Sequence, residues 1–293
     1  MAVSNGMTMS KGTYIIAAIG ANHNGSLATC MSMIRMAYKA GADAVKFQKR
    51  DLDLAIPEEQ KGVLKETPWG VLPYIEYRRH LEFNQPEFDI IAEFCEDLGI
   101  DWFGSAWDIP SAEFLLRYEP KHIKVPSAKI TDIALLRWIA ANSFAATVIS
   151  TGMSDMVEIR QAVTLLPDAT ILHCNSTYPC PNDELNLRTI RTLKSEFPKN
   201  KVGYSGHERG IAASVAAVAL GAKVIERHFT LDRSMWGTDQ AASLEPSGFA
   251  RMVKDIRVVD IALGDGIKRI YPGEKVARDK LRGNVTSAPV RRS

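Results

Sequence analysis

The sequence predicts an α/β fold of the (β/α)8 type, a TIM barrel that forms a single domain. Short apolar runs of strand length alternate with longer helical patterns along the whole chain. The 293 residues suit one such barrel, and no Pro-, Gly- or Ser-rich linker divides them. With 46% apolar residues the chain can bury a large core. A doubly wound sheet is the alternative, but repeated strand–helix units in one undivided length favour the barrel.

Eight apolar runs are the expected strands of the barrel. In chain order they span 14–20, 44–48, 101–107, 122–127, 147–151, 170–177, 202–207 and 223–229. The first run, "YIIAAIGA", resembles the apolar core of a signal peptide. It continues directly into the polar "NHNG" without a small-residue cleavage pattern, so a buried strand is the better interpretation.

Helical patterns fill the gaps between these strands. The segment 27–41 carries apolar residues at spacings of three and four and closes on a glycine. The segment 85–99 has proline in its first turn, acidic residues early and glycine at its end. Further helices are expected in "DIALLRWIAA", "DMVEIRQAVTLL", "LNLRTIRTLKSEF", "GIAASVAAVALG" and 246–264. The irregular connection 49–84 predicts an extended loop beside the active site.

The expected organisation is a flexible N-terminus over 1–12, the barrel over 13–267 and a basic tail over 268–293. The tail holds eight lysines and arginines against Glu274 and Asp279, whereas the whole chain has a net charge of only +2. A solvated tail explains this pattern better than a nucleic-acid-binding arm. The small net charge gives no reason to expect nucleic acid as a partner.

The cysteines indicate the compartment. Cys30, Cys95, Cys174 and Cys180 are not spaced as a zinc knuckle or a redox pair. In a chain of this length they indicate reduced thiols and a cytoplasmic protein. No apolar run approaches the ~18 residues that a membrane-spanning helix needs, so no membrane partner is expected.

Polar side chains follow the expected strands at the end where a barrel forms its active site. Lys46 and Lys124, on the second and fourth strands, would point into one barrel mouth, where two buried ammonium groups need a counter-anion. Short donors that suit phosphate or carboxylate oxygens lie at the same end. They are Ser127, Ser150, Ser176 and Ser205. Each of these residues has a structural explanation on its own, but their accumulation at one end favours an anion site.

Two histidines end the last two strands. His207 lies in "GYSGHERG" and His228 in "VIERHFTLD". Because these strands are neighbours in a barrel, both imidazoles can converge on one divalent ion. Two histidines with open coordination positions suit Mn²⁺, Fe²⁺, Co²⁺ or Zn²⁺ better than Mg²⁺. The pair alone leaves a purely structural role equally open.

The motifs "IIAAIGANHNGS", "AGADAVKFQ", "IKVPSAKITD", "STGM", "LHCNSTYPCP", "VGYSGHERG" and "KVIERHFTLDRSMWGTDQ" occur in this order. In combination they resemble the sialic acid synthase family, over roughly residues 14–282. Members of that family condense phosphoenolpyruvate with an open-chain amino sugar. The resemblance implies a TIM barrel, a phosphoenolpyruvate site and a divalent metal ion, with Mn²⁺ as the first choice and Mg²⁺, Co²⁺ or Zn²⁺ as alternatives.

The resemblance also implies roles for individual residues. His207 and His228 match the family's metal ligands, and Lys46 and Lys124 match its phosphoenolpyruvate-binding lysines. Asp239, in "GTDQ", matches an aspartate near the metal and the sugar. These five are the expected catalytic residues. The further expected phosphoenolpyruvate contacts are Ser127, Ser150, Ser176, Tyr178 and Ser205. The expected sugar contacts are Asn22, His23, Gln48 and Asp239.

In the implied reaction, C3 of phosphoenolpyruvate attacks the sugar aldehyde. Water then adds to C2, and expulsion of phosphate leaves a 3-deoxy-2-keto sugar acid. Orientation of two bound reactants is expected to be the largest catalytic contribution. Polarisation of the aldehyde by the metal is the second.

The chain departs from the family pattern at several positions. Ala18 stands where the family has a glutamate, and Gly206 where it has an aspartate, so we expect a change in which sugar is accepted. Arg227 replaces a lysine and Gln240 a histidine. The family's C-terminal antifreeze-like domain, which supplies an arginine to the sugar in the partner subunit, is not found after "YPGEKVARDKLR". We hypothesise that Arg282 of the basic tail takes that arginine's place.

Three functions remain open at this point. The first is a metal-dependent synthase that joins phosphoenolpyruvate to an open-chain aldose or amino sugar. The second is a synthase of the octulosonate-phosphate type, which acts on a phosphorylated sugar and which the basic tail would suit. The third is a non-catalytic sugar- or phosphoenolpyruvate-binding relative, disfavoured because both lysines and both histidines remain. A homo-oligomer, either dimer or tetramer, is expected.

Overall fold

Eight parallel strands close into a barrel in the computed structural model, which describes residues 12–142 and 144–282. The order of neighbours is β1-β10-β9-β8-β7-β6-β5-β2. The strands are β1 Tyr14–Gly20, β2 Ala44–Lys49, β5 Asp101–Ala106, β6 Ile123–Val125, β7 Thr147–Ser150, β8 Thr170–Cys174, β9 Val202–Gly206 and β10 Val224–His228. The predicted barrel is confirmed, and a doubly wound sheet is excluded because the sheet closes. All but the last residue of the expected flexible N-terminus 1–12 lies outside the described residues.

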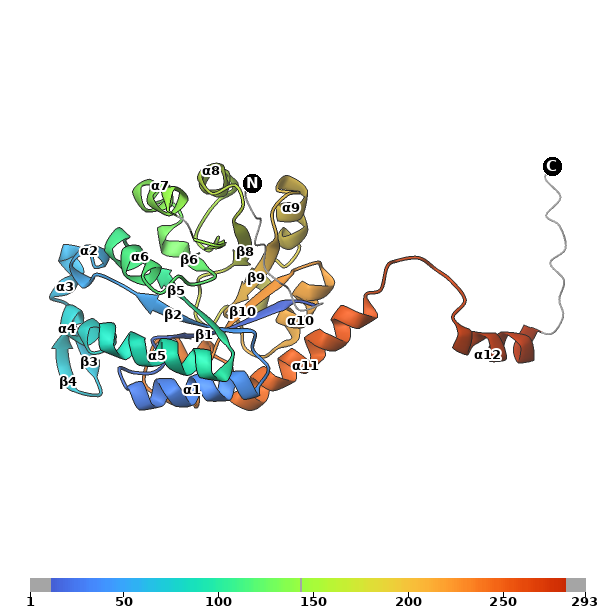
Figure 1. Cartoon of the computed structure of the whole chain (residues 1–293), viewed down its shortest axis with the longest axis horizontal. Coiled ribbons are helices and arrows are strands. Elements are labelled where there is room, and N and C mark those ends of the chain that lie inside the picture. The colour runs from blue at the N-terminus through green and yellow to red at the C-terminus, as the bar shows by residue number, and fades with distance from the viewer. Residues whose placement is uncertain (1–11, 143, 283–293) are drawn as a thin grey trace.

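Helices surround the barrel (Figure 1). They are α1 Leu27–Lys39, α5 Gln85–Leu98, α6 Ile109–Leu116, α7 Ile133–Ala141, α8 Met156–Leu165, α9 Thr189–Glu196, α10 Ala212–Ala219 and α11 Pro246–Ala262. Short 3₁₀ helices lie in three loops: η1 Ser127–Lys129, η2 Asn182–Glu184 and η3 Gln240–Ala242. The helix ends follow from the sequence. Asn84 and Glu87 form a capping box before α5, and Gly99 ends that helix with a φ of 69°.

The connection between β2 and α5 is more ordered than the predicted extended loop. It holds α2 Leu52–Ala55, α3 Glu58–Lys61, a hairpin of β3 Leu64–Thr67 and β4 Gly70–Pro73, and α4 Tyr74–Arg79. The loop prediction is wrong because elements of four to six residues carry too few positions to show a period. The hairpin strands are also largely exposed, so they lack apolar alternation.

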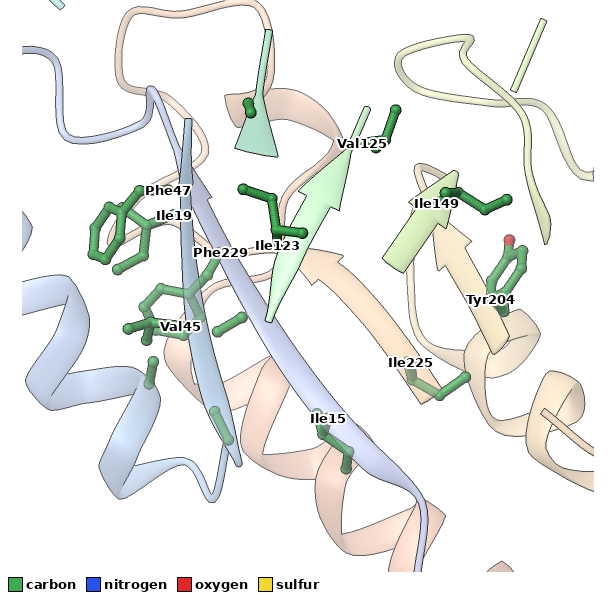
Figure 2. Close-up of a cluster of buried hydrophobic side chains, with 14 of the residues drawn as sticks. Ile15, Ile19, Val45, Phe47, Ile123, Val125, Ile149, Tyr204, Ile225 and Phe229 are labelled. Carbon is green, nitrogen blue, oxygen red and sulfur yellow. The ribbon is translucent and has the colours of Figure 1, made fainter. Parts of the chain in front are cut away.

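Side chains alternate between the two faces of each barrel strand. The outward ones pack beneath the helices, where burial of each large apolar side chain contributes about 1.5–3 kcal/mol. Figure 2 shows this layer, which includes Ile15, Val45, Ile123, Ile149 and Ile225. The inward ones form a second apolar cluster inside the barrel. Its members are Tyr14, Ile16, Ala44, Phe103, Val148, Leu172 and Val224.

The barrel interior becomes polar one inward position further along the strands. Two residues beyond Ala44, Phe103 and Val224 lie Lys46, Ser105 and Glu226, all buried. The apolar cluster therefore forms a dry floor beneath a ring of polar groups at the carboxyl ends of the strands. The register of the barrel strands therefore determines where the candidate active site lies.

The basic segment after the barrel stands apart from it. α12, Pro272–Arg282, lies well away from the barrel (Figure 1), and residues 261–282 are all exposed. The rest of the expected tail, beyond 282, is outside the described residues. In the described part of the chain, no helix combines the length and the apolar character needed to cross a membrane.

Candidate active site

A cavity of about 220 Å³ opens at the carboxyl ends of the strands. Its wall is built from β2 and from β5 through β10 in turn, together with the loops that follow them. The structure brings most of the predicted site residues together here. They are Lys46, Gln48, Lys124, Ser127, Ser150, Ser176, Tyr178, Ser205, His207 and His228. Asn22, His23 and Asp239 do not line it.

Glu226 joins the two lysines at the floor of the cavity. Its Oε1 lies 2.7 Å from Lys46 Nζ and its Oε2 lies 2.7 Å from Lys124 Nζ. Burial alone would raise the pKa of Glu226, but the two ammonium groups outweigh burial and hold that pKa well below its usual range. The sequence predicted that an external anion balances the lysines. The protein itself supplies one negative charge, so one positive charge is left for a ligand.

The pKa of Lys124 depends on the same surroundings. Burial lowers its pKa to about 8, with Lys46 acting in the same direction and Glu226 opposing it. The group is therefore mostly protonated at pH 7. Sequence reasoning missed Glu226, although it lies two residues before His228 and hence on the same face of β10.

Several buried polar atoms of the cavity wall have no hydrogen-bond partner among the described residues. They are Ser105 Oγ, Ser150 Oγ, Trp107 Nε1 and His228 Nδ1. A buried polar group left unpaired costs about 1–3 kcal/mol, so a cluster of them facing one cavity indicates that a ligand satisfies them. Ser105 and Trp107 were not among the predicted contacts. Positions 103, 105 and 107 are every second residue along and just after β5, and Phe103 points into the barrel. This period of two could have identified Ser105 and Trp107 as cavity residues.

The loop after β7 makes a small cradle with two predicted serines. The Gly152 backbone N–H donates to Ser127 Oγ at 3.0 Å. A Cβ atom at position 152 would lie 2.2 Å from Ser176 Oγ and 2.9 Å from Ser127 Oγ, so only glycine fits without displacing them. Three loops thus meet in what we call the serine cradle (Ser127, Gly152, Ser176). Its hydroxyl groups suit the oxygens of a phosphate or carboxylate.

His207 and His228 lie close together in the part of the cavity wall formed by β9 and β10. The ring centroids of His207 and His228 lie 5.4 Å apart, and Tyr178 stacks on His207 at 3.9 Å. His207 Nδ1 lies 2.6 Å from the carbonyl oxygen of Asn175. Because a carbonyl only accepts, Nδ1 carries the hydrogen and Nε2 keeps its lone pair.

These imidazoles fit a divalent transition-metal ion. Burial, followed by repulsion from His228, lowers the pKa of His207 to about 3, and burial also lowers the pKa of His228. Both rings are therefore neutral at pH 7, the form that binds metals. The carbonyl of Asn175 orients His207 as an outer-shell partner does in metal sites. Among the described residues, no group of three His, Cys, Asp or Glu side chains is placed to hold an ion. The remaining positions would be open to water or substrate.

The predicted sugar contacts occupy different environments. Gln48 lines the cavity. Asn22 Nδ2 donates to the Phe229 carbonyl and to Ser243 Oγ, and this ties the loops after β1 and β10 together. His23 is buried against Phe83, with ring centroids 4.1 Å apart. Their contact with a sugar stays a prediction.

Asp239 lies next to His228 but does not line the cavity. Its Oδ2 atom is 4.0 Å from His228 Nδ1, and its Oδ1 atom accepts a hydrogen bond from Thr238. The neighbouring Gln240 is buried and donates to the carbonyls of Asn22 and Trp236, so it holds this loop in place.

Ala18 and Gly206 stand where the resembled family pattern has carboxylates, and they lie on opposite faces of the barrel sheet. Ala18 pairs in register with Lys46 and His228, on the inward face. Gly206 faces outward, because its neighbours Ser205 and His207 both line the cavity. The expectation that Gly206 changes the sugar site is therefore wrong.

Gly206 instead makes room for a buried ion pair outside the barrel. A Cβ there would lie 2.5 Å from Glu208 Oε2 and 2.6 Å from the Tyr204 ring. Arg227 Nη1 lies 2.7 Å from Glu208 Oε1, and Tyr204 donates to Glu208 Oε2 at 2.7 Å. Positions 206, 208 and 227 thus form one unit.

The fold and the cavity define a barrel protein in which a buried lysine pair lies in the same cavity as two neutral histidines. Comparison with known proteins gives the particular family. The model of the NeuB family matches residues 33–268. The chain is 39% identical over 280 residues to N-acetylneuraminate-9-phosphate synthase of Homo sapiens, which covers 94% of this chain and 77% of the relative.

Two further comparisons agree with this family. The chain is 34% identical to N,N'-diacetyllegionaminic acid synthase of Legionella pneumophila, over 93% of this chain and 79% of that one. The crystal structure of N-acetylneuraminic acid synthetase from Leptospira borgpetersenii matches with a TM-score of 0.82 at 30% identity, over 93% of each chain. The chain belongs to the NeuB family, as its motifs predicted. It is a sialic acid-type synthase, a phosphoenolpyruvate-condensing transferase.

Proposed function

We propose that the protein joins phosphoenolpyruvate to the aldehyde of an open-chain amino sugar, giving a sialic-acid-like 3-deoxy-2-keto acid and phosphate. The observation that carries this proposal is the cavity itself. A net positive lysine pair, two neutral imidazoles and buried hydroxyl groups without a hydrogen-bond partner among the described residues all line it. Relatives named for a phosphorylated and for an unphosphorylated product are similarly close, so the relationship leaves the acceptor undecided.

Phosphoenolpyruvate would occupy the side of the cavity formed by β6 to β8. Lys46 and Lys124 neutralise its charge, and the serine cradle with Ser150 receives its oxygens. C3 then attacks the sugar aldehyde, a C–C bond forms, and positive charge develops at C2. Water adds at C2, its proton is lost, and the C–O bond to phosphate breaks. Sugar, phosphoenolpyruvate and water thus yield the keto acid and inorganic phosphate in balance.

The acceptor would lie on the other side, near the histidine pair. His207 and His228 would hold a divalent ion, Mn²⁺ first, which supplies polarisation of the aldehyde oxygen. Tyr178, stacked on His207, closes that side of the cavity. Holding both reactants in one small volume supplies much of the rate enhancement.

We further propose a cytoplasmic homo-oligomer. The four cysteines are free and buried, which supports a reducing compartment. Exposed apolar side chains on the last two helices and on the segment between them, including Ile261, Tyr271 and Leu281, support association between copies.

The experiment supplies phosphoenolpyruvate, Mn²⁺ and a panel of aldoses and N-acetylated amino sugars, and follows phosphate release and keto-acid formation. We expect turnover that needs a sugar and stops on chelation. His228→Ala should lose both bound metal and activity. Phosphate release without a keto acid, or a metal content unchanged in His228→Ala, would contradict the proposal.

A further inference from the structure

The loop after β8, residues 175–180, contacts His207 in three ways. His207 Nδ1 donates to the carbonyl oxygen of Asn175 at 2.6 Å. The backbone N–H of Cys180 donates to the carbonyl oxygen of His207 at 3.0 Å. The ring of Tyr178 stacks on the imidazole. One loop thus holds the ring edge, the ring face and the main chain of this histidine, so the conformation of the loop determines where the imidazole points.

The side chain of Asn175 fixes the first part of this loop. Its Oδ1 atom accepts a hydrogen bond from the backbone N–H of Thr177 at 2.9 Å, which closes an Asx-turn. Its Nδ2 atom donates to the carbonyl oxygen of Glu184, in η2, at 3.2 Å. Asn175 therefore uses its side chain to hold the loop and its carbonyl oxygen to receive His207.

Little apolar packing holds the same part of the loop. It borders a second cavity, of about 650 Å³, which Asn175, Ser176, Thr177 and Glu184 all help to line. Thr177 is exposed and Asn175 is half-buried. A segment with few buried apolar contacts opens at a low cost in free energy. The two side-chain hydrogen bonds of Asn175 are therefore important for keeping the loop in place.

The carbonyl oxygen of Asn175 also determines which nitrogen of His207 keeps its lone pair. While the carbonyl accepts from Nδ1, the hydrogen stays on Nδ1 and Nε2 can bind a metal ion. The Sγ atom of Cys174 lies 3.8 Å from Nδ1, but a thiol is a weak hydrogen-bond partner and does not replace the carbonyl. If the carbonyl moved away, the hydrogen could shift to Nε2, and that tautomer has no lone pair there for a metal.

We propose that Asn175 is a positioning residue, whose side chain keeps its own carbonyl oxygen against His207 Nδ1 and so keeps His207 Nε2 free for the metal ion. This inference rests on the proposed function, which supplies the ion. Outer-shell partners of metal-binding histidines contribute about 10- to 100-fold in metal affinity. A side-chain substitution at position 175 leaves the carbonyl itself in the chain and removes only what holds it. Such variants therefore test positioning and not the loss of an acceptor.

The test is calorimetric binding of Mn²⁺ to the full chain in the absence of substrates. Asn175→Ala should weaken Mn²⁺ binding about tenfold or more. Asn175→Ser keeps a hydroxyl that can accept from the Thr177 N–H but cannot donate to Glu184 in the same way, so its affinity should lie between those of the alanine variant and the wild type. Asn182→Ala is the matched control and should bind as the wild type, because Asn182 is exposed and lines neither cavity.

Kinetics with the sugar that the panel identifies separates positioning from a general loss of structure. In Asn175→Ala the apparent KM for Mn²⁺ should rise about tenfold, whereas kcat at saturating Mn²⁺ should stay within about threefold, because the bound ion then orients the imidazole. A lower kcat with an unchanged KM for Mn²⁺ would overturn the proposal, as would equal Mn²⁺ affinities of Asn175→Ala and Asn182→Ala. If Asn175→Ala fails to fold, Asn175→Ser decides between these outcomes by the same two measurements.

Failure of the proposed function would look different. In that case the wild type binds no Mn²⁺ or no sugar yields a keto acid, whatever the variant. The imidazole N–H resonances of the metal-free protein still test Asn175 then. A slowly exchanging Nδ1–H signal of His207 that is present in the wild type and in Asn182→Ala, but lost in Asn175→Ala, supports the positioning role. A signal that Asn175→Ala leaves unchanged, or that the wild type lacks, overturns it.

Discussion

Glu226 is the residue on which the charge balance of the cavity depends. We expect Glu226→Gln to lose about 3–5 kcal/mol of stability, because two buried ammonium groups lose their shared carboxylate. The melting temperature should fall by roughly 10 °C. Bound phosphoenolpyruvate should restore more stability to the variant than to the wild type, since it brings back negative charge.

Thermal unfolding with and without phosphoenolpyruvate measures both effects. The matched control is Glu196→Gln, which removes one partner of the exposed Arg160 ion pair and should cost less than about 1 kcal/mol. Equal losses in the two variants would show that Glu226 does not hold the lysines.

His122 lies at the other end of the barrel interior, against Tyr14 and Phe103. Burial lowers its pKa to about 4, whereas the unfolded chain titrates near 6.5. Between these values the unfolded state binds more protons, so stability falls as the pH drops below 6.5. His122→Phe should reduce that slope by up to about 1.4 kcal/mol per pH unit.

Urea unfolding in EDTA at pH 7.5, 6.5 and 5.5 measures the slope. The control variant is Val157→Ala, at an exposed position without a titratable group, so its slope should match that of the wild type. Catalytic activity at pH 7.5 should survive in His122→Phe, because His122 does not line the cavity. A slope unchanged by His122→Phe would show that His122 is protonated in the folded protein.

At the scale of elements, the loop after β7 determines the shape of the serine cradle. In Gly152→Ala the new Cβ would displace Ser127 and Ser176, so KM for phosphoenolpyruvate should rise about tenfold or more while folding changes little. Steady-state kinetics measures this. In Gly62→Ala the added Cβ meets nothing within 4 Å, so that control should behave as the wild type. An unchanged KM in Gly152→Ala would place phosphoenolpyruvate elsewhere.

The sequence predicted the strands and long helices, whose apolar residues recur with a regular period. It did not predict the short elements between β2 and α5, which show no such period. Barrel strands show alternating inward and outward residues, so Lys46, Lys124, His207 and His228 could be placed at strand ends in advance. The burial of Arg78 on α4 could not be predicted, because a helix of six residues is too short to show a period in the sequence.

At the scale of the whole molecule, the basic tail is separate from the barrel. Removal of 264–293 should change the free energy of unfolding of the barrel itself by less than about 0.5 kcal/mol, because residues 264–282 are all exposed, whereas association between copies should weaken. We expect KM for the acceptor to rise, since Arg282 is the hypothesised sugar contact. α12 stands away from its own barrel (Figure 1). Contact between Arg282 and a bound sugar would therefore require a second copy of the chain.

Arg282→Ala should reproduce the effect of truncation on KM, and Arg278→Ala, on the same helix, should not. Sedimentation velocity of the full chain tests the expected dimer or tetramer. An acceptor KM unchanged by truncation would remove Arg282 from the site.

The ion pair beneath Gly206 restricts how this enzyme can change by single substitutions. Aspartate at 206 would collide with Glu208 and Tyr204, whereas a shorter residue at 208 alone would leave the fully buried Arg227 without its carboxylate. Each single step toward the aspartate of the resembled family pattern therefore passes through a less stable protein, so we expect positions 206, 208 and 227 to change together. A chimaera that takes residues 202–208 from a relative with aspartate at 206 should fold only if position 227 on β10 is exchanged as well.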